Sequence, residues 1–179
     1  MRDVALLILN WNGAHWLDAC LSAATESAAC VWVVDNGSSD QSLDLVRARF
    51  PHVRVLALEH NYGFGAAYNR AMQVVDAPLV ALLNNDTEVQ GGWLDHLLSA
   101  LAAHPRAAAV GSKLLQWRRP DLINHAGGQL TLLGAAFDIG LDALDGPTYD
   151  ASRPIGCATG AAMLIRRDAF LKVGGFDER

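Results

Sequence analysis

The chain has 179 residues, of which 51% are hydrophobic and 18% charged, and its formal net charge is -5. A chain of this size and composition can bury one good core, which excludes an intrinsically disordered protein and predicts a single domain. Lys and Arg cluster only at Arg118-Arg119 and Arg166-Arg167, which argues against a nucleic-acid-binding surface, and no apolar stretch reaches the length of a membrane span.

The first hundred residues alternate between apolar strands and amphipathic helices. We predict strands over residues 4–10, 31–34, 53–58 and 79–83. Helices are predicted over residues 13–25, after Asp35 up to Pro51, over 65–75, and from about Trp93 to a stop near Pro105. Repeated strand–helix units are typical of a doubly wound parallel sheet in an α/β protein.

Two of these helices carry more specific signals. In the first helix, a single buried face is expected to hold Trp16, Leu17, Cys20, Leu21 and Ala24. Before the second helix, Ser38 and Gln41 have the spacing of a capping box.

The pattern changes after Pro105. A strand is predicted over residues 107–115, an irregular, β-rich flank over the sheet at 116–152, and a glycine-broken strand at 156–165. Asp168 is expected to cap a short helix that Gly174 ends. We therefore predict one α/β domain over residues 1–179, with a Rossmann-like, mainly parallel sheet and helices on both faces.

Polar residues follow three of the predicted strands at their carboxyl ends. Asn10 and Asn12 follow the first strand, Asp35 ends the second, and Asn84-Asn85-Asp86 ends the fourth. In an open α/β sheet the ligand crevice lies beyond the carboxyl ends of the parallel strands. We therefore expect these side chains to converge on one site for an anionic or metal-bound ligand.

The carboxylates at these strand ends each have two interpretations. Alternation along an extended segment would turn Asn84 and Asp86 into the site and Asn85 away from it. A single carboxylate suits Mg²⁺ or Mn²⁺ that also holds ligand phosphates, whereas the alternative is a plain Asx turn with Thr87. Asp35 is not needed for the cap from Ser38, so it can bind a ribose hydroxyl or a base N–H, unless it only forms a helix-entry turn.

The glycines at Gly63 and Gly65 resemble part of a dinucleotide-binding fingerprint. The third glycine of that fingerprint would fall at Tyr68, and the segment follows the third strand and not the first, so we reject that interpretation. A loop of this kind that opens a helix can still present backbone N–H groups to a phosphate. Among the histidines, only His125, beside Gly127-Gly128, is a further candidate.

Five motifs in order resemble the inverting GT-A glycosyltransferases of family 2, and most of all their rhamnosyltransferase-like branch. The resemblance spans residues 4–179 and rests on Ile8-Leu9-Asn10-Trp11-Asn12-Gly13, Val34-Asp35-Asn36-Gly37-Ser38-Ser39-Asp40, Asn61-Tyr62-Gly63-Phe64-Gly65 with Asn69, Leu83-Asn84-Asn85-Asp86, and Gly174-Gly175-Phe176-Asp177-Glu178. It implies a GT-A fold in which Asp86 binds Mg²⁺ or Mn²⁺. It also implies a donor site formed by Asn10, Asn12, Asp35, Asn61, Gly63, Gly65, Asn69 and Asn84.

The resemblance further implies the reaction. A UDP- or dTDP-linked sugar, with rhamnose as one candidate, would pass with inversion to a hydroxyl of a saccharide or lipid-linked saccharide acceptor. A cytoplasmic location is expected, with peripheral association at the inner face of the membrane only through parts outside this chain.

Two positions depart from the family pattern. The first acid of the family's Asp-x-Asp is Asn84 here. The usual catalytic base of the family follows the Gly-Gly-Phe-Asp-Glu segment, which would place it beyond Arg179. We therefore expect a catalytic domain truncated at its C-terminus, in which Asp177 and Glu178 are the candidates for the base.

Two alternatives stay open at this point. A nucleotidyltransferase that makes nucleotide sugars would need a Gly-rich, cationic loop after the first strand, but the chain has Asn10-Trp11-Asn12-Gly13-Ala14-His15 there. The other alternative is a nucleotide-sugar-binding module without catalytic activity.

Overall fold

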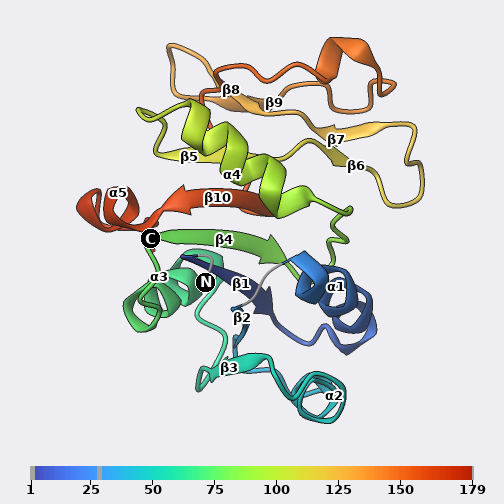
Figure 1. The fold of residues 1–179 in the computed structure, drawn as a ribbon, viewed down its shortest axis with the longest axis vertical. Coiled ribbons are helices and arrows are strands. Elements are labelled where there is room, and N and C mark those ends of the chain that lie inside the picture. Colours follow the sequence, from blue (N-terminus) through green and yellow to red (C-terminus); the bar gives the residue numbers. More distant parts are fainter. Residues whose placement is uncertain (1–2, 28–29, 179) are drawn as a thin grey trace.

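A six-stranded sheet forms the centre of the computed structural model, which describes residues 3–27 and 30–178 (Figure 1). The strand order is β3-β2-β1-β4-β10-β5. Their bounds are β1 (Val4–Asn10), β2 (Val31–Asp35), β3 (Arg54–Ala57), β4 (Leu79–Asn84), β5 (Ala109–Gly111) and β10 (Ala162–Arg166). The first four strands are parallel, and β10 runs antiparallel to both of its neighbours, β4 and β5. The prediction of a mainly parallel α/β sheet is confirmed.

Helices cover both faces of this sheet. One face carries α1 (Ala14–Ser27), α2 (Ser42–Arg49) and α4 (Trp93–Ala103), and the other carries α3 (Phe64–Val74) and α5 (Arg167–Lys172). Successive side chains of a strand point to opposite faces, so in β1 Leu6 and Ile8 pack on the first set and Leu7 packs on the second. The central strands are therefore buried on both sides, which explains their unbroken apolar sequences. Within the described ranges, no helix combines the length and apolarity needed to cross a membrane.

The order of the strands creates a switch point between β1 and β4. From β1 the chain moves outward through β2 to β3, and it then returns to place β4 on the other side of β1. Asn10 lies opposite Asp35, and Leu9 opposite Asn84. The polar ends of β1, β2 and β4 thus lie side by side at a position where open α/β sheets bind ligands, as the sequence predicts.

The flank beyond α4 consists of two small antiparallel sheets and a short 3-10 helix, Pro147–Tyr149. Its strands are β6 (Leu114–Leu115), β7 (Ile123–His125), β8 (Gly128–Leu130) and β9 (Ala136–Asp138). The flank is β-rich as predicted, but its strands lie beyond the edge strand β5 and α4 in Figure 1 and do not lie over the sheet.

Two predicted strands are shorter than expected. The strand predicted over residues 107–115 is divided into β5 and β6, and the one predicted over 156–165 is a strand only from Ala162. The reason for the second difference is Gly128, whose N–H donates to the Cys157 carbonyl (2.9 Å) and whose carbonyl accepts the Gly156 N–H (2.8 Å). Gly156 and Cys157 therefore pair with the flank and not with the central sheet.

The placement of Trp16 on a buried face is wrong. Trp16 is 37% exposed, and its ring centroid lies 4.9 Å from that of His15 and 5.7 Å from that of Trp117. Trp16 belongs to the first turn of α1, where its ring contacts the segment after β6 and is not covered by the central sheet.

Two of the predicted helix caps are also wrong. Helix α2 begins at Ser42, so Ser38 and Gln41 form no capping box, and the Ser38 hydroxyl accepts the N–H of Asn12 (2.9 Å). Helix α5 begins at Arg167 and has no side-chain cap among the described residues, so Asp168 is not its cap. The predicted stop at Gly174 is confirmed: its N–H donates to the Leu171 carbonyl, and that of Gly175 donates to the Phe170 carbonyl, as in a Schellman motif.

Asp40 caps two helices at once. One carboxylate oxygen accepts the N–H of Ala14 (3.0 Å), the first residue of α1, and the other accepts the N–H of Ser42 (3.0 Å), the first residue of α2. Desolvation raises the pKa of Asp40, but the hydrogen bonds from Ser42 and Ala14 outweigh it and leave the pKa below its usual 3.8.

We expect Asp40→Ala to lower the free energy of unfolding by about 1–2 kcal/mol at neutral pH, because two helix N-termini lose an acceptor. Urea denaturation measures this loss. Asp44→Ala is the control, since Asp44 is 82% exposed and its ion pair with Arg47 lies on the surface of α2. Because the pKa of Asp40 in the folded protein is below 3.8, its ionised carboxylate stabilises the fold above that pH. This stabilisation is lost as the pH falls through the lowered pKa. Equal stability of wild type and Asp40→Ala at neutral pH would contradict this assignment.

Candidate functional site

Asn10 links the ends of three strands. Its Nδ2 donates to Asp35 Oδ1 (2.9 Å), and its Oδ1 accepts from Asn85 Nδ2 (2.7 Å). Asn10 is fully buried, and buried polar groups persist when they are hydrogen-bonded in this way. A fixed polar network therefore joins the ends of β1 and β2 to the turn after β4.

Asp35 is part of that network and is only 1% exposed. Its Oδ2 accepts the N–H of Ser38 (3.0 Å), so Asp35 takes part in the turn after β2, as the alternative interpretation of this residue expects. An ionised carboxylate offers about four lone-pair sites, so Asp35 keeps acceptor capacity beyond its two bonds. Its role in binding a donor stays a prediction.

The corner after β4 differs from the prediction. The expectation that Asn85 turns away from the site is wrong, because Asn85 is the residue that bonds to Asn10. Alternation ends where the strand ends, at Asn84, and a turn follows in which the Thr87 N–H donates to the Asn84 carbonyl (3.2 Å). The Asn84 carbonyl also accepts the thiol of buried Cys20 (3.5 Å), while the Asn84 side chain is half-buried.

Gly13 provides the space for Asn85. An added Cβ at Gly13 would lie 1.9 Å from Asn85 Nδ2 and 2.7 Å from Asn10 Oδ1. Gly13, directly after Asn12, is thus the sequence feature that indicates a side chain packed against this backbone position.

We expect Gly13→Ala to displace Asn85 and to lower the free energy of unfolding by about 1–3 kcal/mol, the usual cost of overpacking. If a nucleotide binds at these strand ends, the effect of the substitution on nucleotide binding should be larger than its effect on stability, because the Asn10–Asn85 contact changes shape. Gly91→Ala is the matched control, since no described atom lies within 4 Å of its added Cβ. Thermal unfolding and nucleotide titration measure both effects; a Gly13→Ala protein as stable as Gly91→Ala would show that Asn85 is not held there.

Asp86 follows this corner and is exposed. Burial is the main cause that raises the pKa of the Cys20 thiol to about 12, and the negative charges of Asp86 and Glu88 contribute in the same direction. Within the described residues, no group of three or more His, Cys, Asp or Glu side chains forms a metal cage. An ion that keeps several waters and shares the oxygens of ligand phosphates fits this donor set, as Mg²⁺ does in nucleotide-binding enzymes.

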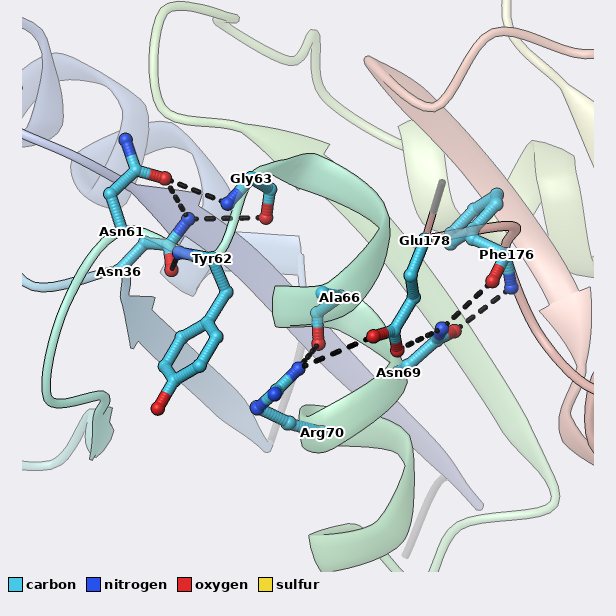
Figure 2. Close-up of polar contacts among 9 residues, drawn as sticks. All are labelled: Asn36, Asn61, Tyr62, Gly63, Ala66, Asn69, Arg70, Phe176 and Glu178. Carbon is cyan, nitrogen blue, oxygen red and sulfur yellow. Dashed lines mark hydrogen bonds and ion pairs between the residues drawn. The ribbon is translucent and has the colours of Figure 1, made fainter.

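The loop before α3 is anchored by Asn36, which sequence reasoning did not single out (Figure 2). Asn36 Nδ2 donates to Asn61 Oδ1 (2.9 Å) and to the Gly63 carbonyl (3.2 Å), and Asn36 Oδ1 accepts the Tyr62 N–H (3.0 Å). The Gly63 N–H donates to Asn61 Oδ1 (2.8 Å). The N–H groups of Tyr62 and Gly63 are therefore occupied within the protein and are not presented to a phosphate.

Asn12 locks the loop after β1 to the loop after β2. It has a positive φ of 50°, and its Oδ1 accepts the Ser39 N–H (2.8 Å). An asparagine tolerates this left-handed conformation better than most residues. Asn12 thus joins the two loops at the carboxyl ends of β1 and β2.

The remaining predicted site residues form a second group, where α3 meets the segment after α5. Asn69 is hydrogen-bonded to Phe176 and to Glu178. An added Cβ at Gly65 would lie 3.0 Å from Phe176 Cβ and 3.2 Å from the Asp177 carbonyl oxygen. The structure therefore brings Gly65, Asn69, Asp177 and Glu178 together, apart from the Asn10 network.

The expected position of the family's usual catalytic base, beyond Arg179, is not covered by the structure. Arg179 itself lies outside the described residues, so that expectation stays a prediction. The described chain ends with Asp177 and Glu178, both of which are exposed, and they remain the candidates for the base in this chain.

His125 belongs to neither group. It lies in β7 and is buried, and its Nδ1 is 2.6 Å from Asp138 Oδ1 of β9. The contact joins the two small sheets of the flank, and it does not bring His125 to the Asn10 network.

This sheet, with its polar network at the β1–β4 switch point, has the GT-A fold of glycosyltransferases. A mannosyltransferase from Pyrobaculum calidifontis, solved with GDP-Man and Mn²⁺, aligns over 99% of this chain and 48% of its own with a TM-score of 0.69 at 16% identity. The S. aureus TarS 1-349 structure aligns over 100% of this chain and 51% of its own with a TM-score of 0.65 at 18% identity.

The chain belongs to Glycosyl transferase family 2, whose sequence profile matches residues 6–174. It is 34% identical to an N-acetylglucosaminyl-diphospho-decaprenol L-rhamnosyltransferase of Mycobacterium tuberculosis, over 90% of this chain and 59% of that protein. It is also 34% identical to the O-antigen biosynthesis protein RfbC of Myxococcus xanthus, over 72% of this chain and 10% of that protein. The chain spans about three fifths of the length of that rhamnosyltransferase, and its family membership argues against the nucleotidyltransferase alternative.

Proposed function

We propose that this domain binds a nucleoside-diphosphate sugar, UDP- or dTDP-linked, in the crevice at the ends of β1, β2 and β4. The observation that carries the proposal is the Asn10 network, which joins Asp35 and Asn85 into one fixed floor beside the exposed carboxylate of Asp86. In this proposal Asn10, Asn12, Asp35 and Asn84 surround the nucleotide, and the segment of Asn61, Gly63 and Gly65 lines the pocket. Known structures of this fold with GDP-Man or with UDP-GlcNAc support a nucleotide-sugar donor.

Asp86 is the proposed ligand of Mg²⁺ or Mn²⁺, and the Mn²⁺ in the mannosyltransferase structure supports a divalent ion. When bound, such an ion stabilises negative charge on a departing diphosphate. Asp86 is exposed within the turn from Asn84 to Thr87, where its carboxylate can reach an ion shared with the donor.

The proposed reaction transfers the sugar with inversion to a hydroxyl of a saccharide or lipid-linked saccharide. The name of the mycobacterial rhamnosyltransferase describes a lipid-diphosphate-linked sugar as the acceptor and L-rhamnose as the transferred sugar. It therefore supports a lipid-linked saccharide as the acceptor and rhamnose as the sugar. Inverting transfer needs a base that removes the proton of the acceptor hydroxyl. Asp177 and Glu178 are the proposed candidates in this chain.

A thermal-shift screen of UDP, dTDP and GDP and their sugars, with and without Mn²⁺, tests the donor assignment. We expect the pyrimidine diphosphates with Mn²⁺ to raise the melting temperature, since a ligand at about 100 times its Kd adds roughly 2.7 kcal/mol of stability. NAD is the control and should have no effect, because position 68 is Tyr68 and not the third glycine of a dinucleotide fingerprint. A shift with NAD and none with any nucleoside diphosphate would overturn the proposal.

A further inference from the structure

Asn69 holds the segment 174–178 against α3 through a complete set of amide hydrogen bonds (Figure 2). Its Oδ1 accepts the Phe176 N–H (2.9 Å), and its Nδ2 donates to the Phe176 carbonyl (2.9 Å) and to Glu178 Oε1 (2.9 Å). A side-chain amide has two N–H donors, so both donors of Asn69 are used. Asn69 therefore has no N–H left for a sugar or a phosphate.

Glycines allow this close contact. Gly175 has a φ of 82°, and an added Cβ there would lie 2.4 Å from Asn69 Oδ1. In α3, the absence of a side chain at Gly65 leaves space for Phe176. The ring centroid of Phe176 lies 5.6 Å from that of Phe64 and 5.1 Å from that of Phe170. The segment is thus seated by shape as well as by hydrogen bonds.

Arg70, the next residue of α3, connects this segment to the loop before the helix. Its guanidinium carbon lies 3.8 Å from the ring centroid of Tyr62, and its Nη1 lies 3.9 Å from Glu178 Oε2. The carboxylate of Glu178 is therefore contacted on one oxygen by Asn69 and on the other by Arg70. Tyr62 is in turn tied to Asn36, which follows Asp35 directly.

We propose that Asn69 is a positioning residue: it fixes Glu178 and the backbone at Asp177 relative to the donor loop, and it does not bind the donor itself. The inference rests on the proposed function for its catalytic consequence, because Asp177 and Glu178 are the candidate bases. It replaces the donor-binding role that the family resemblance implies for Asn69.

The first test compares Asn69→Ala with Gln73→Ala. Gln73 is one turn further along α3, and both side chains line a cavity between α3 and the segment 174–178. Hydrogen exchange at the Phe176 amide should become at least about tenfold faster in Asn69→Ala and stay unchanged in Gln73→Ala. The Kd for the donor should stay within about twofold, whereas kcat for transfer to a saccharide acceptor should fall roughly 10²-fold, as small misplacements of reacting groups do. A weaker donor Kd with unchanged Phe176 exchange would overturn the positioning role and restore the donor-binding one.

A second test uses charge and needs no transfer assay. Asn69→Asp keeps an acceptor for the Phe176 N–H but places a carboxylate beside that of Glu178, so protection at Phe176 should fall. Adding Glu178→Gln removes the repulsion and supplies an N–H donor, and protection should recover in the double variant. Wild-type protection in Asn69→Asp would contradict the proposal. The exchange results stand even where no nucleotide sugar binds the wild type, so failure of the proposed function is distinguishable from failure of this inference.

Discussion

Asp86→Ala should abolish the Mn²⁺-dependent binding of UDP or dTDP while leaving the fold intact. Asp86 is exposed at the corner after β4, so its side chain contributes little to packing. Loss of a residue that only orients a metal ligand already costs about 10–100-fold in metal affinity, and we expect loss of the carboxylate ligand itself to cost at least about 100-fold. Calorimetric titration of the nucleotide with Mn²⁺, and again with a chelator, measures the effect.

Glu88→Ala is the control for this prediction, because Glu88 is an exposed carboxylate in the same segment whose charge also reaches Cys20. It should keep nucleotide affinity within a few-fold. If Asp86→Ala binds as tightly as wild type, or if Glu88→Ala is the variant that loses the metal dependence, the metal assignment to Asp86 is wrong.

Asp35→Ala should lower the free energy of unfolding by about 2–5 kcal/mol in addition to weakening nucleotide binding. The substitution removes the acceptor of two hydrogen bonds, one from buried Asn10 and one from the N–H of half-buried Ser38, and a buried donor left unsatisfied costs about 1–3 kcal/mol. Urea denaturation without ligand isolates the stability term. Asp76→Ala is the matched control, since Asp76 is exposed and should change stability by less than about 0.5 kcal/mol.

The outcome separates two roles of Asp35. A protein that is fully stable but unable to bind nucleotide would mean that the carboxylate serves the ligand alone. A destabilised protein that still binds nucleotide tightly would mean that Asp35 only builds the crevice. The network around Asn10 leads us to expect both effects together.

Hydrophobic periodicity predicted the layers of this fold, because it is a local signal. The unbroken apolar run through Leu6, Leu7 and Ile8 and the helical spacing of Leu94, Leu97 and Leu101 can be read without knowing their partners. The direction of β10 cannot be predicted in this way, because the apolar sequence of Ala162–Arg166 fits a parallel and an antiparallel strand equally well. Its antiparallel place between β4 and β5 depends on the path of the whole flank.

The candidate site was predictable where it depends on strand ends and not where it depends on side-chain contacts. Asn10 and Asp35 converge because neighbouring parallel strands end together. Asn85 was misplaced because alternation was extended past Asn84, where the strand ends. The bond from Asn69 to Phe176 spans 107 residues of sequence, and no local pattern indicates which distant backbone an amide will meet.

The buried thiol of Cys20 is a probe, already present in the chain, for the separation of α1 from the end of β4. Thiolates, and not thiols, react with alkylating reagents, and a buried group whose pKa is raised to about 12 is almost entirely protonated at neutral pH. The half-buried Cys30 and Cys157 should therefore be labelled first in the native protein. Modification of Cys20, counted by mass, would then report how often α1 separates from the end of β4.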